Sequence, residues 1–247
     1  MCRHLAYLGA PRSLSALLLE PPHSLYAQSY APRRQRYGTV NADGFGAGWY
    51  VPGRAEPVRY RRAQPIWSDP SFASLAPTVA SSCVLGAVRS ATAGYPSDES
   101  CAAPFTHDRW LFSHNGRAFD PALLRKNLAD AVAWVPDALG PVDSAFLFGL
   151  AVARWSGGAS LGAGLAGVVR AVAGAGDGRL TLLATDGRAL AGTTWGEPLY
   201  VRREPEAVVI AAEPHDDEPA WREVPDRSLV VADPETVTVT PLLEEAQ

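Results

Sequence analysis

The stretch that decides the fold is MCRHLAYLG, residues 1–9, at the start of the chain. From Cys2 to Gly9 it is short, rich in apolar residues and closed by a glycine, which predicts a first β-strand. Cys2 is small, so the initiator Met1 is expected to be removed. Cys2 would then carry a thiol and a free α-amine on one Cα.

Cys2 has two interpretations. An α-amine has a reference pKa of roughly 7.7–8.0, so part of it is neutral at physiological pH and can act as a base beside the thiol. Cys2 would then be a nucleophile with its own general base. A free cysteine also behaves as a small hydrophobe, and taken alone Cys2 favours this interpretation, a half-buried position in a first strand. The motifs further along the chain distinguish the two.

The composition is that of an ordinary globular protein. The chain has 247 residues, of which 47% are hydrophobic and 19% charged, and we expect a single domain over residues 2–247. A net charge of −4 gives no reason to expect nucleic acid as a partner. Three cysteines without close spacing predict no disulfide framework. No signal peptide and no apolar run of about 20 residues is visible, so we expect a cytoplasmic protein that does not enter membranes.

The element order predicts an α+β fold. Strands are expected first, then helices over 121–132, 142–155 and 160–176, then short strands from 179 onward with a hairpin turn at Asp186–Gly187. Ser24 and Asp69 are expected to cap short helices, the first with Leu25, Ala27 and Tyr30 on one face. The segment 95–108 is expected to be a long loop.

Polar residues follow an apolar strand in GAVRSATAG, residues 86–94. Arg89 and Thr92 emerge where this strand ends. A buried arginine is costly unless an anion meets it, so Arg89 either grips a substrate carboxylate or pairs with an acidic side chain of the chain itself. The candidates for such an ion pair are Asp43, Asp98 and Glu99.

The motif SHNG, residues 113–116, follows the apolar strand WLF. The Asn115 amide and the Gly116 N–H can together form an oxyanion hole. Asn–Gly is also a common tight turn, and a turn at Asn115–Gly116 is expected here. His114 is expected to be a structural histidine at the strand end.

Asp143 opens the apolar helix predicted over 142–155. Its carboxylate is expected to serve as the helix N-cap, and it could also bind a substrate ammonium group. No metal is expected, because Cys2, His4, His107 and His114 match no standard zinc spacing. No cofactor is expected either, since GFGAG (44–48) fits neither a phosphate loop nor a dinucleotide fingerprint.

Taken together, these stretches resemble the class II glutamine amidotransferases, which are N-terminal nucleophile hydrolases. The resemblance covers nearly the whole chain and rests on five motifs in order: Cys2, DGFGAGW (43–49), AVRSATAG (87–94), HNG (114–116) and DS (143–144). It implies a four-layer αββα sandwich of two antiparallel sheets.

The resemblance also implies roles for these residues. Cys2 would attack the γ-amide carbonyl of a glutamyl group, and Asn115 and Gly116 would stabilise the oxyanion. Arg89 would bind the glutamyl α-carboxylate and Asp143 its α-ammonium. Thr92, His114 and Ser144 would also line the substrate site.

Two further stretches, QSYAPRRQRYGTVNADGFG (28–46) and AAEPHDD (211–217), are similar to those of one branch of this family, the γ-glutamyl hydrolases of ergothioneine biosynthesis. That branch removes glutamate from γ-glutamyl-hercynylcysteine sulfoxide. The alternative is a glutaminase subunit that supplies ammonia to a separate synthetase. Ala93 and Ala103 stand where ammonia-producing members often have histidines, so the handling of glutamine is expected to differ from theirs. The expected partner is a small γ-glutamyl substrate, and a homodimer is possible.

Overall fold

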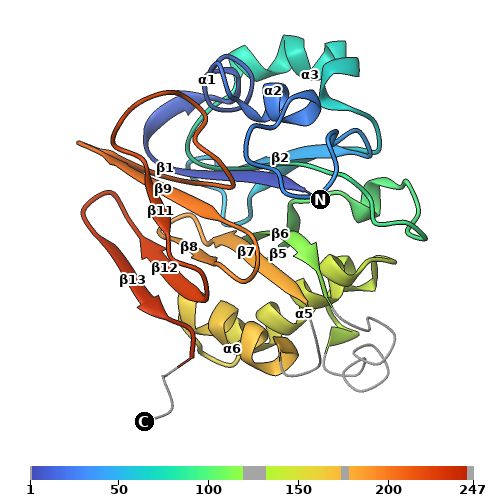
Figure 1. Cartoon of the computed structure of the whole chain (residues 1–247), viewed down its shortest axis with the longest axis vertical. Helices are drawn as coiled ribbons and strands as arrows, with labels where there is room; N and C mark the ends of the chain where they lie inside the picture. Colours follow the sequence, from blue (N-terminus) through green and yellow to red (C-terminus); the bar gives the residue numbers. More distant parts are fainter. Residues whose placement is uncertain (1, 119–131, 174–177, 244–247) are drawn as a thin grey trace.

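The computed structural model describes residues 2–118, 132–173 and 178–243. Within them, two antiparallel sheets stack face to face (Figure 1). The first sheet has the strand order β11(Arg222–Val224), β9(Leu199–Glu204), β10(Ala207–Ala211), β1(Arg3–Ser13), β4(Ala80–Val88), β2(Phe45–Trp49), β3(Val58–Arg62). The second has the order β13(Val237–Pro241), β12(Ser228–Ala232), β8(Leu190–Thr193), β7(Arg179–Thr185), β6(Trp110–Arg117), β5(Phe105–His107).

Helices cover the outer face of each sheet. On the first sheet lie α1(Leu14–Leu18), α2(Leu25–Tyr30) and α3(Pro70–Leu75), at the top of Figure 1. On the second lie α5(Asp143–Ser156) and α6(Leu161–Ala173), at the bottom of the same view. This arrangement confirms the predicted αββα sandwich.

Side-chain alternation along the strands explains the layers. In β1, Leu5 and Tyr7 pack against the helices of the first sheet, whereas Ala6 and Leu8 enter the core between the sheets. Successive strand residues point to opposite faces, so a central strand that is apolar throughout can support two cores at once. Gly48 of β2 allows close packing there, because a Cβ at this position would lie 2.7 Å from a methyl group of Leu111 in β6.

Local sequence signals place several elements correctly. The Asp69 side chain accepts a hydrogen bond from Phe72 N at 3.0 Å and caps α3, and Ser24 caps α2. The hairpin between β7 and β8 turns at Asp186–Gly187, where Gly187 has φ +85°. The predicted helix 121–132 lies almost entirely outside the described residues.

Four local predictions are wrong. The face of α2 that is buried carries Leu25, Gln28 and Ser29, whereas Tyr30 is exposed. The segment 95–108 contains a 3-10 turn, Glu99–Cys101, and the short strand β5. The supposed turn at Asn115–Gly116 is part of β6, which pairs with β7 as far as Arg117. Asp143 is the first residue of α5 and Val142 its N-cap.

Candidate active site

The predicted site residues come together at one end of the sandwich. Cys2 is half-buried directly before β1, and the register Arg3↔Val88 places it beside the end of β4. A pocket at this point is lined by Cys2 and by residues from four later stretches of the chain: Arg89, Ser90, Ala91, Thr92, Tyr95, Cys101, Ala103, Phe105, His114, Gly116, Val142, Asp143 and Ser144. Seven of the eight predicted residues line it, and Asn115 is the exception.

Arg89 is held in place by backbone carbonyls. Its guanidinium group donates to the carbonyl oxygens of Asp43 and Pro96, both at 3.1 Å, and the residue is 6% exposed. Asp43 is fixed in turn, because its side chain accepts from Ala91 N at 2.7 Å. Among the described residues, no carboxylate lies within 4 Å of the Arg89 guanidinium. The geometry therefore favours an external anion over an internal ion pair.

Replacing Arg89 with lysine should weaken substrate binding. An ammonium group cannot bond two carbonyls and grip a carboxylate with the planar fork of a guanidinium. We expect KM to rise roughly ten- to a hundredfold, with a smaller change in kcat, measured by steady-state glutamate release. Arg188→Lys, on the exposed hairpin turn, is the control. An unchanged KM for Arg89→Lys would remove Arg89 from the binding site.

Asp143 offers an unpaired negative charge. One of its oxygens accepts from Ala118 N at 2.7 Å and the other from Ser144 N at 2.9 Å. No basic side chain of the described chain lies within 4 Å of this carboxylate. Its position at the start of α5 suits a negative charge, because the helix dipole is positive there. The carboxylate is thus fixed by backbone N–H groups and remains available to a cation.

His114 connects three elements below the pocket. Its Nε2 lies 2.9 Å from the carbonyl oxygen of Arg179, and its Nδ1 lies 2.9 Å from the Ser144 hydroxyl. A carbonyl can only accept, so Nε2 carries the proton, and in the neutral ring the Ser144 hydroxyl donates to Nδ1. This arrangement ties β6 to β7 and α5, which agrees with the structural histidine predicted from the sequence.

Gly116 has a conformation that favours glycine. Its φ is +152°, and a Cβ added there would collide with the carbonyl oxygen of Arg179. A side chain is excluded at this position, and Gly116 lines the pocket with its backbone alone.

Asn115 lies on the other face of β6, fully buried. Neither its Oδ1 nor its Nδ2 has a hydrogen-bond partner in the described chain. Ser113 shares this face and lies 3.1 Å from His4 Nδ1 of β1. β1 begins where β6 ends, and side chains two residues apart in a strand lie on the same face. Cys2 lies two residues before His4, and Asn115 lies two residues after Ser113. The unpartnered amide therefore belongs beside Cys2.

His4 makes the stability of this region dependent on pH. Burial, with added repulsion from Arg3, lowers the pKa of His4 to about 3. Between pH 6.5 and 3 the unfolded chain binds a proton that the folded chain does not, so stability falls as the pH falls through this range. We expect His4 to contribute a loss of about 2 kcal/mol in unfolding free energy between pH 7 and pH 5.

Urea unfolding of the wild type and of His4→Asn at both pH values measures this contribution. The variant cannot titrate at position 4, so it should lose less stability on acidification. His215, whose pKa burial lowers to about 4, is present in both proteins and cancels from the comparison. Equal losses in the two proteins would contradict the assignment.

Three contributions to the pocket could not be found from the sequence. Asp43 was a candidate ion-pair partner of Arg89, but it holds Arg89 through its backbone carbonyl, and this contact carries no sequence signal. Cys101 and Phe105 line the pocket from the segment predicted to be a loop.

Within the described ranges no group of three His, Cys, Asp or Glu side chains could hold a metal ion, and no helix could span a membrane.

Comparison with known proteins identifies the family. The sequence profile of the class-II glutamine amidotransferases matches residues 19–207. The chain belongs to the class II glutamine amidotransferase family. Among members of this family, a γ-glutamyl-hercynylcysteine sulfoxide hydrolase of Mycolicibacterium smegmatis is 47% identical over 242 residues, covering 98% of this chain and 100% of that protein. An enzyme of the same name from Mycobacterium tuberculosis is 44% identical, covering 98% of this chain and 97% of its own.

Solved structures agree on the class II amidotransferase fold. A glutamine aminotransferase class-II domain protein from Silicibacter pomeroyi superposes with a TM-score of 0.68 at 23% identity, covering 98% of this chain and 100% of that one. Glutamine phosphoribosylpyrophosphate amidotransferase from B. subtilis gives a TM-score of 0.70 at 15% identity and covers 98% of this chain and 49% of its own. At these identities the likeness concerns the fold alone.

Proposed function

We propose that this amidotransferase-family protein hydrolyses a γ-glutamyl amide bond, and that its substrate is γ-glutamyl-hercynylcysteine sulfoxide, as the names of its relatives indicate. One observation carries the proposal. The pocket beside Cys2 contains a guanidinium group without a carboxylate partner and a carboxylate without a basic partner in the described chain. A glutamyl group presents the matching α-carboxylate and α-ammonium.

The residue roles follow from this fit. Arg89 binds the α-carboxylate and Asp143 binds the α-ammonium. Thr92, His114 and Ser144 line the rest of the glutamyl pocket. Bound in this way, the glutamyl group directs its γ-carbonyl carbon toward Cys2. The developing oxyanion receives hydrogen bonds from Asn115 Nδ2 and Gly116 N–H.

In this proposal Met1 is removed and the working protein begins at Cys2. The neutral α-amine takes the thiol proton, and the thiolate attacks the γ-carbonyl carbon. The amine then protonates the leaving nitrogen, the C–N bond breaks and a γ-glutamyl thioester forms. Water adds to the thioester, the C–S bond breaks, and glutamate and the free thiol result. A reducing cytoplasm would keep this thiol available.

The test is release of glutamate from the conjugate by protein whose mass shows that Met1 is absent. We expect a kcat/KM for γ-glutamyl-hercynylcysteine sulfoxide at least tenfold above that for glutamine. If the protein hydrolyses glutamine and leaves the conjugate intact, the proposal is wrong. Glutamine turnover that rises on addition of a synthetase would instead support the ammonia-supplying subunit.

A further inference from the structure

A buried carboxylate outside the glutamyl pocket joins two distant parts of the chain. Glu213 lies two residues after the end of β10 and is 1% exposed. Its Oε1 accepts from Arg33 N at 3.1 Å and its Oε2 from Arg34 N at 2.9 Å. A carboxylate that receives two successive backbone N–H groups fixes that backbone firmly. Glu213 therefore fixes the segment 33–37 at its start.

The same carboxylate reaches the strand that carries the nucleophile. Arg3, next to Cys2, is fully buried, and its Nη2 lies 2.6 Å from the carbonyl oxygen of Ala212 and 3.4 Å from Glu213 Oε2. A buried charge is retained only where a partner compensates it. Glu213 is thus the shared partner of Arg3 and of the segment 33–37.

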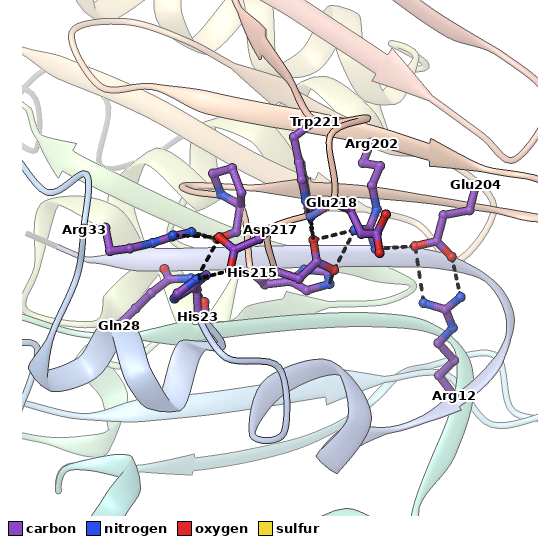
Figure 2. A network of polar contacts seen from close by, with 12 residues as sticks. Arg12, His23, Gln28, Arg33, Arg202, Glu204, His215, Asp217, Glu218 and Trp221 are labelled. Atoms are coloured by element: carbon purple, nitrogen blue, oxygen red, sulfur yellow. Dashed lines mark hydrogen bonds and ion pairs between the residues drawn. The ribbon is translucent and has the colours of Figure 1, made fainter.

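Further polar contacts hold the segment from outside. The Arg33 side chain binds Asp217 at 3.0 Å, and Asp217 also lies 3.0 Å from His23 Nε2 (Figure 2). Arg34 donates to the Tyr200 hydroxyl at 3.0 Å, and this hydroxyl donates to Glu223, also at 3.0 Å. Two consecutive arginines therefore hold the segment on the first sheet.

The segment also reaches the second sheet. The Arg179 guanidinium of β7 lies 4.5 Å from the centre of the Tyr37 ring, a cation–π distance. Arg36, together with Glu197, Glu223 and Asp226, lines a second pocket with a volume of about 110 Å³. This second pocket therefore has charged groups of both signs.

The two pockets share no lining residue. A γ-glutamyl amide has its glutamyl group on one side of the attacked carbonyl and its leaving group on the other. The first pocket suits the glutamyl side. The segment 33–37 runs from Glu213, the partner of Arg3, to Arg179 and contributes no residue to that pocket. The leaving group would therefore meet this segment.

We propose that the segment 33–37 forms the side of the active site that contacts the leaving group, here called the leaving-group wall. Glu213 is the positioning residue that holds this segment against β1, the strand that follows the nucleophile. The proposal rests on the function proposed above. The leaving group of a hercynylcysteine conjugate carries a trimethylammonium group and carboxylates. The mixed charges beside Arg36 fit such a zwitterion.

The experiment compares two substrates in Glu213→Gln. One is γ-glutamyl-hercynylcysteine sulfoxide, and the other is γ-glutamyl-methylamide, whose leaving group is too small to need the wall. Glutamine in place of Glu213 removes the charge and turns one acceptor into a donor facing an N–H group. We expect kcat/KM for the conjugate to fall at least tenfold more than kcat/KM for the methylamide, mainly through KM.

Glu204→Gln is the matched control. Glu204 binds Arg12 and Arg202 in the polar network drawn in Figure 2, which also includes Arg33 and Asp217. Among the described contacts, Glu204 has none with the segment 33–37 or with Arg3. Its substrate preference should match that of the wild type. Equal losses on both substrates in Glu213→Gln, or no loss on either, would overturn the proposal.

A second variant covers the case in which Glu213→Gln does not fold. Arg36 is exposed and has no part in the Glu213 contacts, so Arg36→Ala tests the wall directly by the same tenfold criterion. The outcome for the wild type separates the two proposals. A wild type that leaves the conjugate intact refutes the proposed hydrolase, whereas equal losses in the variant of an active enzyme refute the wall alone.

Discussion

Replacing Cys2 with alanine should abolish glutamate release, with kcat falling by about 10⁴-fold or more. The thiol would form the covalent intermediate, and loss of a nucleophile typically removes most of the catalytic rate. The Arg89 and Asp143 contacts do not involve Cys2, so the glutamyl group should still bind. Single-turnover kinetics and isothermal titration with the conjugate measure the two effects.

Cys83→Ser is the control for this experiment. Cys83 is fully buried between the sheets and its Sγ lies 3.2 Å from the Thr185 hydroxyl, remote from the pocket lining. Burial raises the pKa of its thiol to about 12, so it should resist alkylation at neutral pH while Cys2 reacts. Substantial activity remaining in Cys2→Ala would refute the nucleophile assignment.

Asn115→Ala should separate catalysis from stability. Loss of one oxyanion donor typically lowers kcat by 10²–10³-fold, and we expect that loss here with KM almost unchanged. Both amide atoms of Asn115 are buried without partners in the described chain, so their removal should leave the melting temperature unchanged or raise it. Steady-state kinetics and thermal unfolding provide the two measurements.

Asn41→Ala is the contrasting variant. Asn41 is equally buried, but its Nδ2 donates to Gln28 O and to Gln35 Oε1, both at 2.9 Å. Its truncation leaves these acceptors unpaired and should cost roughly 1–3 kcal/mol of stability. If Asn115→Ala destabilised the protein as much as Asn41→Ala does, Asn115 would have a structural role instead.

The sequence predicted the layers and the site because their signals are local or lie in motifs. Asp69 followed by Pro70 is a typical helix start, and Asp69 caps α3 as expected. The run of apolar residues in β1 is visible in the chain itself. The family motifs gave Arg89 and Asp143, although their partners could not be read from residue order.

Non-local contacts caused the errors. Asn115–Gly116 has the local preference of a turn, but pairing with β7 extends β6 through both residues. Asp143 was expected to be the N-cap of its own helix, whereas it is the first helical residue and accepts from Ala118 N, 25 residues earlier in the chain. The role of Glu213 depends on backbone N–H groups 179 and 180 residues away, which no sequence pattern indicates.

The placement of Cys2 before a central strand has a practical consequence for anyone producing this protein. β1 is bordered by β10 on one side and β4 on the other, so residues added ahead of Cys2 would enter a confined space beside the pocket. They would also convert the α-amine into an amide that cannot accept a proton. An affinity tag should therefore be attached after residue 247, and the expression host must supply a methionine aminopeptidase.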